Sequence, residues 1–218
     1  MRKMIFLGPL YDYVYRSYSM KINHFPLIRL SFYAVDKAIL YTLFFIVLRY
    51  IWIKMKKKQT TFKREFGLVV FMFYVFLLFA LTVFRDGYFI WQFKFYFHRP
   101  LTDINIIPLV ETFKLTKGQS LLDFFYNLYG NIMWFIPMGI FIPALTKRHF
   151  GFVKVVLCGA LISISIETMQ FILNTGVTDI DDVIFNTLGA AVGYLIYFVG
   201  KWIKMRIKIW NFLRKWLI

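Results

Sequence analysis

Five long apolar runs dominate the chain, and short polar segments separate them. The runs extend over about residues 35–53, 66–84, 131–145, 152–173 and 182–202. A helix needs roughly 20 apolar residues to cross the hydrocarbon core of a bilayer, and most of these runs approach that length. The pattern therefore predicts an all-α fold, a polytopic transmembrane helical bundle of about five spans.

Both ends of the chain are amphipathic rather than continuously apolar. Residues 1–34 mix tyrosines with basic residues, a composition that suits the headgroup level, so we predict an interfacial N-terminal arm. The apolar start of this arm stops at Asp12 without a small-residue cleavage site, and we expect no signal-peptide cleavage. Residues 201–218 interleave tryptophans with basic residues and contain no acid, which predicts a basic amphipathic tail on anionic lipid.

These boundaries predict four segments along the chain. Residues 1–34 are the interfacial arm, residues 35–65 the first span and a basic loop, residues 66–200 the main transmembrane domain, and residues 201–218 the tail. Asp36 and Lys37 fall at the expected start of the first span, from which they can reach the headgroups. The third span contains prolines, so we predict a broken helix there.

Composition supports the membrane assignment and excludes a nucleic-acid-binding protein. Of the 218 residues, 60% are apolar and 17% charged, with a mean hydropathy of +0.61. The net charge of +16 comes from basic blocks that flank the apolar runs, and no basic soluble surface remains for nucleic acid. The single cysteine, Cys158, lies inside an apolar run and cannot form a disulfide framework.

The distribution of basic residues predicts how the chain crosses the cell membrane. Residues 54–64 are strongly basic, which by the positive-inside rule places this loop in the cytoplasm. The loop over about residues 85–130 has nearly balanced charge and is expected outside. A multi-pass protein with a cytoplasmic C-terminus follows, and five spans then place the N-terminus outside, where its basic residues conflict with the rule.

Polar residues inside the last two spans form the most informative pattern in the chain. Helical spacing places one group on a single face of the fourth span and the other on a single face of the fifth. The first group is Ser163, Glu167 and Gln170, and the second is Asp179, Asp182, Asn186, Gly189 and Gly193. The turn between these spans is short, so Glu167 and Asn186 are expected to face each other about 10 Å from the turn.

Several chemical interpretations of these residues stay open. Glu167 with Asp179 and Asp182 could bind a divalent cation or act as an acid–base pair, because an ionisable group inside a membrane marks a functional site by default. The aspartates could equally cap a helix, and Glu167 could satisfy buried hydrogen-bond donors. The histidines are scattered, which argues against a zinc site, although oxygen ligands could still hold a hard cation. We assign no metal ligand and expect no cofactor.

Glycines and two asparagines complete the pattern. Gly189 and Gly193 form a small-xxx-small surface, which is typical of close helix packing. Asn105 in the outer loop and Asn131 at the start of the third span add polar groups at the same membrane face, or else hold a turn and cap a helix. The candidate site therefore opens outward.

Four motifs in this order resemble the VanZ-like family over about residues 70–200. They are Asn105-Ile-Ile-Pro108, the segment Asn131–Gly139, Ser163-Ile-Ser-Ile-Glu-x-x-Gln170, and Asp179-Ile-Asp-Asp-x-x-x-Asn186-Thr-x-Gly189-x-x-x-Gly193. The resemblance implies a polytopic membrane protein of Gram-positive bacteria, whose named member is associated with low-level teicoplanin resistance. Many members carry an arginine in the turn before the first aspartate, where this chain has Gly176, Val177 and Thr178.

Two functions from different classes are compatible with these observations. The first is a non-enzymatic envelope protein that binds or shields an outer-leaflet lipid or cell-wall component and lowers susceptibility to lipoglycopeptides such as teicoplanin. The alternative is a membrane-embedded enzyme that uses Glu167, Asp179 and Asp182 on a lipid-linked substrate. The expected partners are membrane lipids, with a cell-wall precursor or the antibiotic itself as further candidates.

Overall fold

The computed structural model describes residues 4–85, 87–110, 121–146 and 150–214. It is 76% helical, and five of its six α-helices are long and apolar enough to cross a membrane. The predicted all-α transmembrane architecture is therefore confirmed.

The elements follow one another as helices with little other structure between them. In chain order they are α1 (Gly8–Tyr18), α2 (Phe25–Met55), α3 (Phe62–Thr82), the 3-10 turns η1 (Ile90–Gln92) and η2 (Leu101–Asp103), β1 (Ile104–Asn105), α5 (Leu121–Leu145), α6 (Phe152–Leu173), β2 (Thr178–Asp179) and α7 (Ile180–Arg214). The two short strands pair with each other. The chain forms two compact units, Met1–Asp103 with Thr168–Thr178, and Ile104–Glu167 with Asp179–Ile218.

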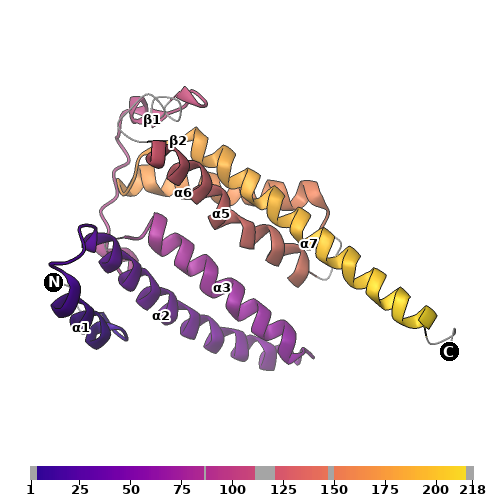
Figure 1. Ribbon diagram of the computed structural model, residues 1–218. Helices are drawn as coiled ribbons and strands as arrows, with labels where there is room; N and C mark the ends of the chain where they lie inside the picture. The colour runs from indigo at the N-terminus through magenta and orange to yellow at the C-terminus, as the bar shows by residue number, and fades with distance from the viewer. Residues whose placement is uncertain (1–3, 86, 111–120, 147–149, 215–218) are drawn as a thin grey trace. The chain divides into compact units, whose positions relative to one another are not determined.

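In the first unit, α2 and α3 form an antiparallel hairpin (Figure 1). An ion pair of 2.8 Å between Arg49 and Glu65 joins the two helices near their connection. α1 packs on the start of α2 through aromatic rings, with centroids 6.3 Å apart for Tyr11 and Phe25. The helix α2 begins at Phe25, ten residues before the predicted start of the first span, because apolar and aromatic residues continue the helix toward the N-terminus.

The early start of α2 changes the position of Asp36, which was expected to reach the headgroups. The carboxylate is fully buried and accepts a hydrogen bond from the Tyr88 hydroxyl. It also accepts three backbone N–H groups, at 2.8, 2.8 and 2.7 Å, from Ile5, Phe6 and Leu7. Burial, followed by the hydrogen bond to Asp36, raises the pKa of the Tyr88 phenol, so this hydroxyl stays a donor.

Lys37 is buried beside Asp36 instead of reaching the headgroups. Only 2% of the residue is exposed, and its ammonium group donates to the carbonyls of Phe84 and Gly87, the latter at 3.2 Å. Both acceptors lie just after α3, where carbonyl oxygens without helical partners are available. The expectation that Asp36 and Lys37 extend to the headgroups is wrong, because tertiary partners satisfy both charges inside the unit.

In the second unit, α5 and α7 pack against each other along their length. Gly193 is required at this interface, since an added Cβ atom would lie 2.9 Å from the Cα atom of Gly139 and closer still to the Ile136 carbonyl oxygen. Gly189 meets the backbone of Ile132 in the same way. These glycines allow the helix backbones to touch, as a small-xxx-small surface does.

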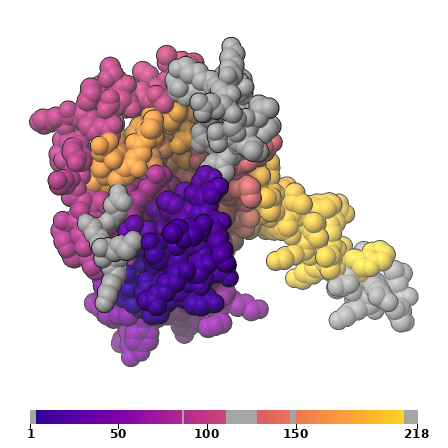
Figure 2. Space-filling model, turned by 60° about the vertical axis from the view of Figure 1, so that its left-hand side comes forward, coloured from indigo at the N-terminus to yellow at the C-terminus, as the bar shows by residue number. Residues whose placement is uncertain are grey.

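One sequence prediction about the helices of this unit is wrong. α5 runs as one helix from Leu121 to Leu145 through Pro137 and Pro143, whereas the prolines predicted a broken span. α7 is one helix that includes residues 201–214, so the segment predicted as a basic amphipathic tail is helical and continues directly from the fifth span. Its 35 residues correspond to about 52 Å, and its C-terminal end extends past α5 and α6 (Figures 1 and 2).

Candidate functional site

The polar residues predicted as a site gather where α7 begins in the second unit. The polar cluster is defined here as Asn105, Asn131, Glu167, Asp179, Asp181 and Asp182. Asp179 ends β2 and directly precedes α7, and its carboxylate accepts the N–H of Asp181 at 2.9 Å. This is an N-cap interaction, and the positive end of the helix dipole favours the acidic side chains around it.

Glu167 is a buried carboxylate of the polar cluster, with only 5% of the residue exposed. Its Oε2 atom accepts the backbone N–H of Asp179 at 3.0 Å, so it ties α6 to the residue that caps α7. Asn186 donates to the Oγ atom of Ser163 at 2.9 Å, one turn further from the connection between the two helices. The two polar stripes therefore face each other as predicted, with Ser163 rather than Glu167 as the hydrogen-bonded partner of Asn186.

Two asparagines approach the aspartates from other elements. Asn131 donates from Nδ2 to Asp182 at 2.5 Å, and Asn105 on β1 donates from Nδ2 to Asp179 at 3.2 Å. Asn131 lies well inside α5 instead of at the start of a helix, because α5 begins at Leu121. Both asparagines therefore belong to the polar cluster.

Asp181 is part of the polar cluster, although the predicted site residues leave it out. Its carboxylate is buried and accepts the backbone N–H of Leu109 at 2.6 Å. Leu109 has a φ of 65°, a left-handed conformation that is rare for a residue with a branched side chain. The only sequence signal for this role was the Asp-x-Asp-Asp run, in which Asp181 looked like one more capping residue.

Gln170 belongs to the other compact unit, the one that contains Thr168–Thr178. Its side-chain Nε2 donates to the backbone carbonyl of Thr82 at 3.2 Å, which ties the end of α6 to the end of α3. Its Oε1 atom is buried without a hydrogen-bond partner among the described residues. Gln170 shares a helical face with Glu167, but its observed hydrogen bond serves the packing of a different unit.

The hydrogen bonds define what the polar cluster can do chemically. Each of its four carboxylates accepts a hydrogen bond from this chain's own backbone or from an asparagine side chain. Across the part of the chain that the structure describes, no group of three or more His, Cys, Asp and Glu residues is arranged to hold a metal ion. These hydrogen bonds hold backbone segments in place, including the residues that follow β1.

Two substitutions of Glu167 separate its hydrogen bond from its charge. Glu167→Gln keeps an oxygen acceptor for the Asp179 N–H, and we expect a loss of unfolding free energy below about 1 kcal/mol. Glu167→Leu leaves that buried N–H without an acceptor, and we expect a loss of about 1–3 kcal/mol. Thermal unfolding of both purified variants in detergent measures the difference, and equal losses would contradict the assigned acceptor role.

The five apolar helices and their buried polar network define a multi-pass helical membrane protein. The sequence profile of VanZ/LLP1 matches residues 71–203, which is more than half of the chain, and the chain belongs to this family. Protein VanZ of Enterococcus faecium is 34% identical over 73 residues. The aligned part covers 34% of this chain and 45% of that relative, and no solved structure matches the chain. The resemblance seen in the four motifs is confirmed.

Proposed function

We propose that this chain is a non-enzymatic protein of the cell envelope that binds an outer-leaflet lipid or a lipid-linked cell-wall component. Occupying that component lowers the access of lipoglycopeptides such as teicoplanin to the cell surface. Membership in the VanZ/LLP1 family and the similarity to Protein VanZ support this class of function. The structural support comes from the loop that the polar cluster holds.

The observation that carries the proposal is an exposed apolar loop fixed by buried carboxylates. Ile106 and Ile107 are 71% and 64% exposed, and Leu109 and Val110 are exposed beside them. Asn105 precedes this loop and is bound to Asp179, while Asp181 holds the strained Leu109 backbone. Fixing an apolar loop before binding reduces the entropy cost of association, so the loop suits an apolar ligand.

The length of α7 supports an outward position for this loop. The 19 helical steps from Asp182 to Lys201 rise about 29 Å, close to the thickness of a hydrocarbon core. The acidic end and the basic end of α7 therefore suit opposite membrane surfaces. By the positive-inside rule the basic end is cytoplasmic, and the loop then faces the outer leaflet.

The hydrogen bonds of the polar cluster favour binding over chemistry. A general acid or base must reach the proton of a bound substrate. In this site Glu167 and Asp181 are buried, and each accepts a backbone N–H of the chain itself. Their carboxylates support the loop, and the apolar side chains of the loop are left to meet the ligand.

Replacing both exposed isoleucines tests the proposal. We expect that expression of the wild-type chain in a teicoplanin-susceptible Gram-positive host lowers the binding of labelled teicoplanin to cells. The double variant Ile106→Ser, Ile107→Ser removes the apolar contact but leaves the network intact, and cells expressing it should bind teicoplanin like the empty-vector strain. Teicoplanin binding is measured by flow cytometry, together with the minimal inhibitory concentration.

A substitution of an exposed apolar residue outside the loop keeps this test specific. Met20 is 99% exposed and belongs to the first unit, whereas the loop belongs to the second, so Met20→Ser should leave teicoplanin binding at the wild-type level. Membrane levels of all variants are compared by immunoblot. Unchanged teicoplanin binding between the wild-type and empty-vector strains would refute the proposed function.

A further inference from the structure

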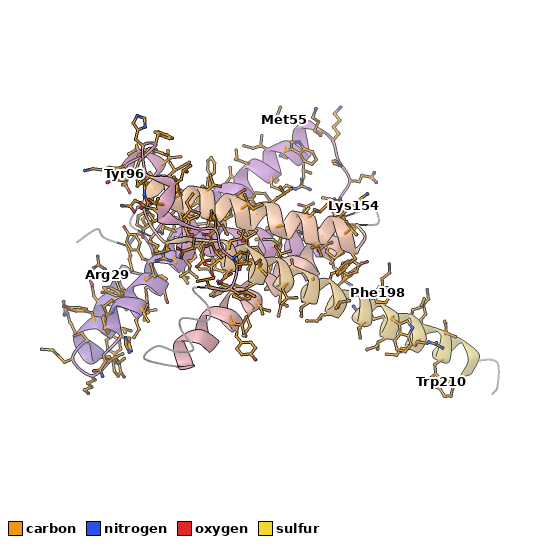
Figure 3. The ribbon with its side chains drawn as sticks, turned by 90° about the horizontal axis from the view of Figure 1, so that it is seen from above. Arg29, Met55, Tyr96, Lys154, Phe198 and Trp210 are labelled. Carbon is orange, nitrogen blue, oxygen red and sulfur yellow. The ribbon has the colours of Figure 1, made fainter. Side chains whose placement is uncertain are left out.

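A second feature lies at the other end of the transmembrane helices of the second unit. A cavity of about 720 Å³ opens between the end of α5, the two residues just before α6 and the C-terminal half of α7. Figure 3 shows Lys154 near the start of α6, and Phe198 and Trp210 along the part of α7 that extends past it. The lining includes Tyr194, Tyr197, Phe198, Lys201, Lys204 and Lys208 of α7.

The side chains that α7 contributes change in character along the helix. Aromatic rings line the first part of the cavity, at Tyr194, Tyr197 and Phe198. Three ammonium groups follow at Lys201, Lys204 and Lys208, and their spacing of three and four residues places them on one helical face. The cavity is therefore apolar at one end and cationic at the other.

No acidic residue of α7 offsets this charge. The sequence contains neither Asp nor Glu after Asp182, so the lysines have no acidic neighbour on their own helix. Like charges three or four residues apart repel each other, and an anion between them relieves that repulsion. The concentration of positive charge in a cavity thus favours an anionic ligand.

The position of the cavity relative to the helix ends indicates where that ligand comes from. α5 ends at Leu145 and α6 begins at Phe152, so these two helix ends lie at one membrane surface. The aromatic part of the cavity lies on the side of the hydrocarbon core, and the lysines follow toward the extending end of α7. This order matches a lipid, whose acyl chains lie deeper than its headgroup.

We propose that this cavity binds one phosphate-bearing anionic lipid. Lys201, Lys204 and Lys208 contact the phosphate group, and Tyr194, Tyr197 and Phe198 pack against the upper acyl chains. The site is separate from the exposed loop of the proposed function, because about 29 Å of α7 lie between Asp182 and Lys201. Binding of this lipid holds α7 at a fixed depth relative to one leaflet.

Native mass spectrometry of the full-length protein in detergent tests this site with phosphatidylglycerol as the probe. We expect phosphatidylglycerol to bind at least about tenfold more tightly than zwitterionic phosphatidylcholine with the same acyl chains. Each of Lys201→Gln, Lys204→Gln and Lys208→Gln should weaken phosphatidylglycerol binding about fivefold, the factor that corresponds to about 1 kcal/mol per basic residue near a headgroup. The triple variant should lose the preference for phosphatidylglycerol.

Arg206 provides a matched control on the same helix. It carries the same charge at the same level, but it stacks on Trp202 and does not line the cavity. Arg206→Gln should therefore leave phosphatidylglycerol binding unchanged. An equal loss of phosphatidylglycerol binding for Arg206→Gln and the lysine variants would mean that general surface charge binds the lipid. That result would overturn the proposed site.

A second arm distinguishes a lipid from a soluble phosphate. Glycerol phosphate and inorganic phosphate, added in excess, should not displace phosphatidylglycerol, because they lack acyl chains for the aromatic part of the cavity. Phe198→Ser should weaken phosphatidylglycerol binding without changing the fold, since Phe198 is 55% exposed. Displacement by glycerol phosphate, or equal binding of the two lipids to the wild type, would overturn the proposal.

Discussion

Replacing Gly193 with leucine is expected to abolish the folded second unit. The new Cβ atom would meet the Cα atom of Gly139 and the carbonyl oxygen of Ile136, and both are backbone atoms of α5 that cannot rotate away. The helices must separate to accept it, which removes their packing along the whole interface. We expect a loss of more than about 3 kcal/mol, at the upper end for overpacked sites. Fluorescence-detected size-exclusion chromatography measures the fraction of monodisperse protein.

Gly200 is the control for this substitution. It lies on the same helix, two turns further on, and an added Cβ atom there meets no atom within 4 Å. Gly200→Leu should therefore give monodisperse protein at the wild-type level. A folded Gly193→Leu variant with an unchanged Tm would show that α5 and α7 do not pack backbone to backbone.

Replacing Asp36 with alanine is expected to release the N-terminal segment from the first unit. Three backbone N–H groups and the Tyr88 hydroxyl lose their shared acceptor. Since each buried donor left unpaired costs about 1–3 kcal/mol, and water will reach some of them, we expect a loss of about 3–5 kcal/mol. The Tm of the purified variant and its sensitivity to limited proteolysis near the N-terminus measure this loss.

The loss should not depend on pH in the neutral range. The pKa of Tyr88 is raised in the folded state, so its stabilising contribution is fully present below its ordinary value of about 10 and declines only above it. The Tm difference between wild type and Asp36→Ala should therefore be similar at neutral and mildly alkaline pH. Asp12→Ala, an exposed change of the same charge on α1, should leave the Tm unchanged.

The transmembrane helices could be predicted because their signal is local. An apolar run of sufficient length has to form a helix in a bilayer, whatever its neighbours are. Helical periodicity also placed Ser163 and Glu167 on one face of the fourth span. It placed Asp179, Asp182 and Asn186 on one face of the fifth span, and the two faces together indicated the polar cluster. Gln170 follows the same period, yet its partner is Thr82, 88 residues earlier, and no periodic pattern can indicate such a partner.

The predictions failed where distant parts of the chain supply the compensating interactions. Pro137 and Pro143 predicted a broken helix from local chemistry alone, but α5 continues through both while packed on α7. Asp36 and Lys37 were assigned to the headgroups because two charges in an apolar run need water or partners. Their partners lie up to 52 residues away in the chain.

By itself, the sequence determined the membrane class, the number of long apolar helices, the family motifs and the small-xxx-small surface of Gly189 and Gly193. These properties follow from hydropathy and periodicity, which act over a few turns of helix. Only the tertiary structure decided that Asp181 holds Leu109 and that three lysines of α7 share one cavity. Hydrogen bonds and cavities depend on side chains brought together from distant segments, and the order of residues does not specify which of those segments meet.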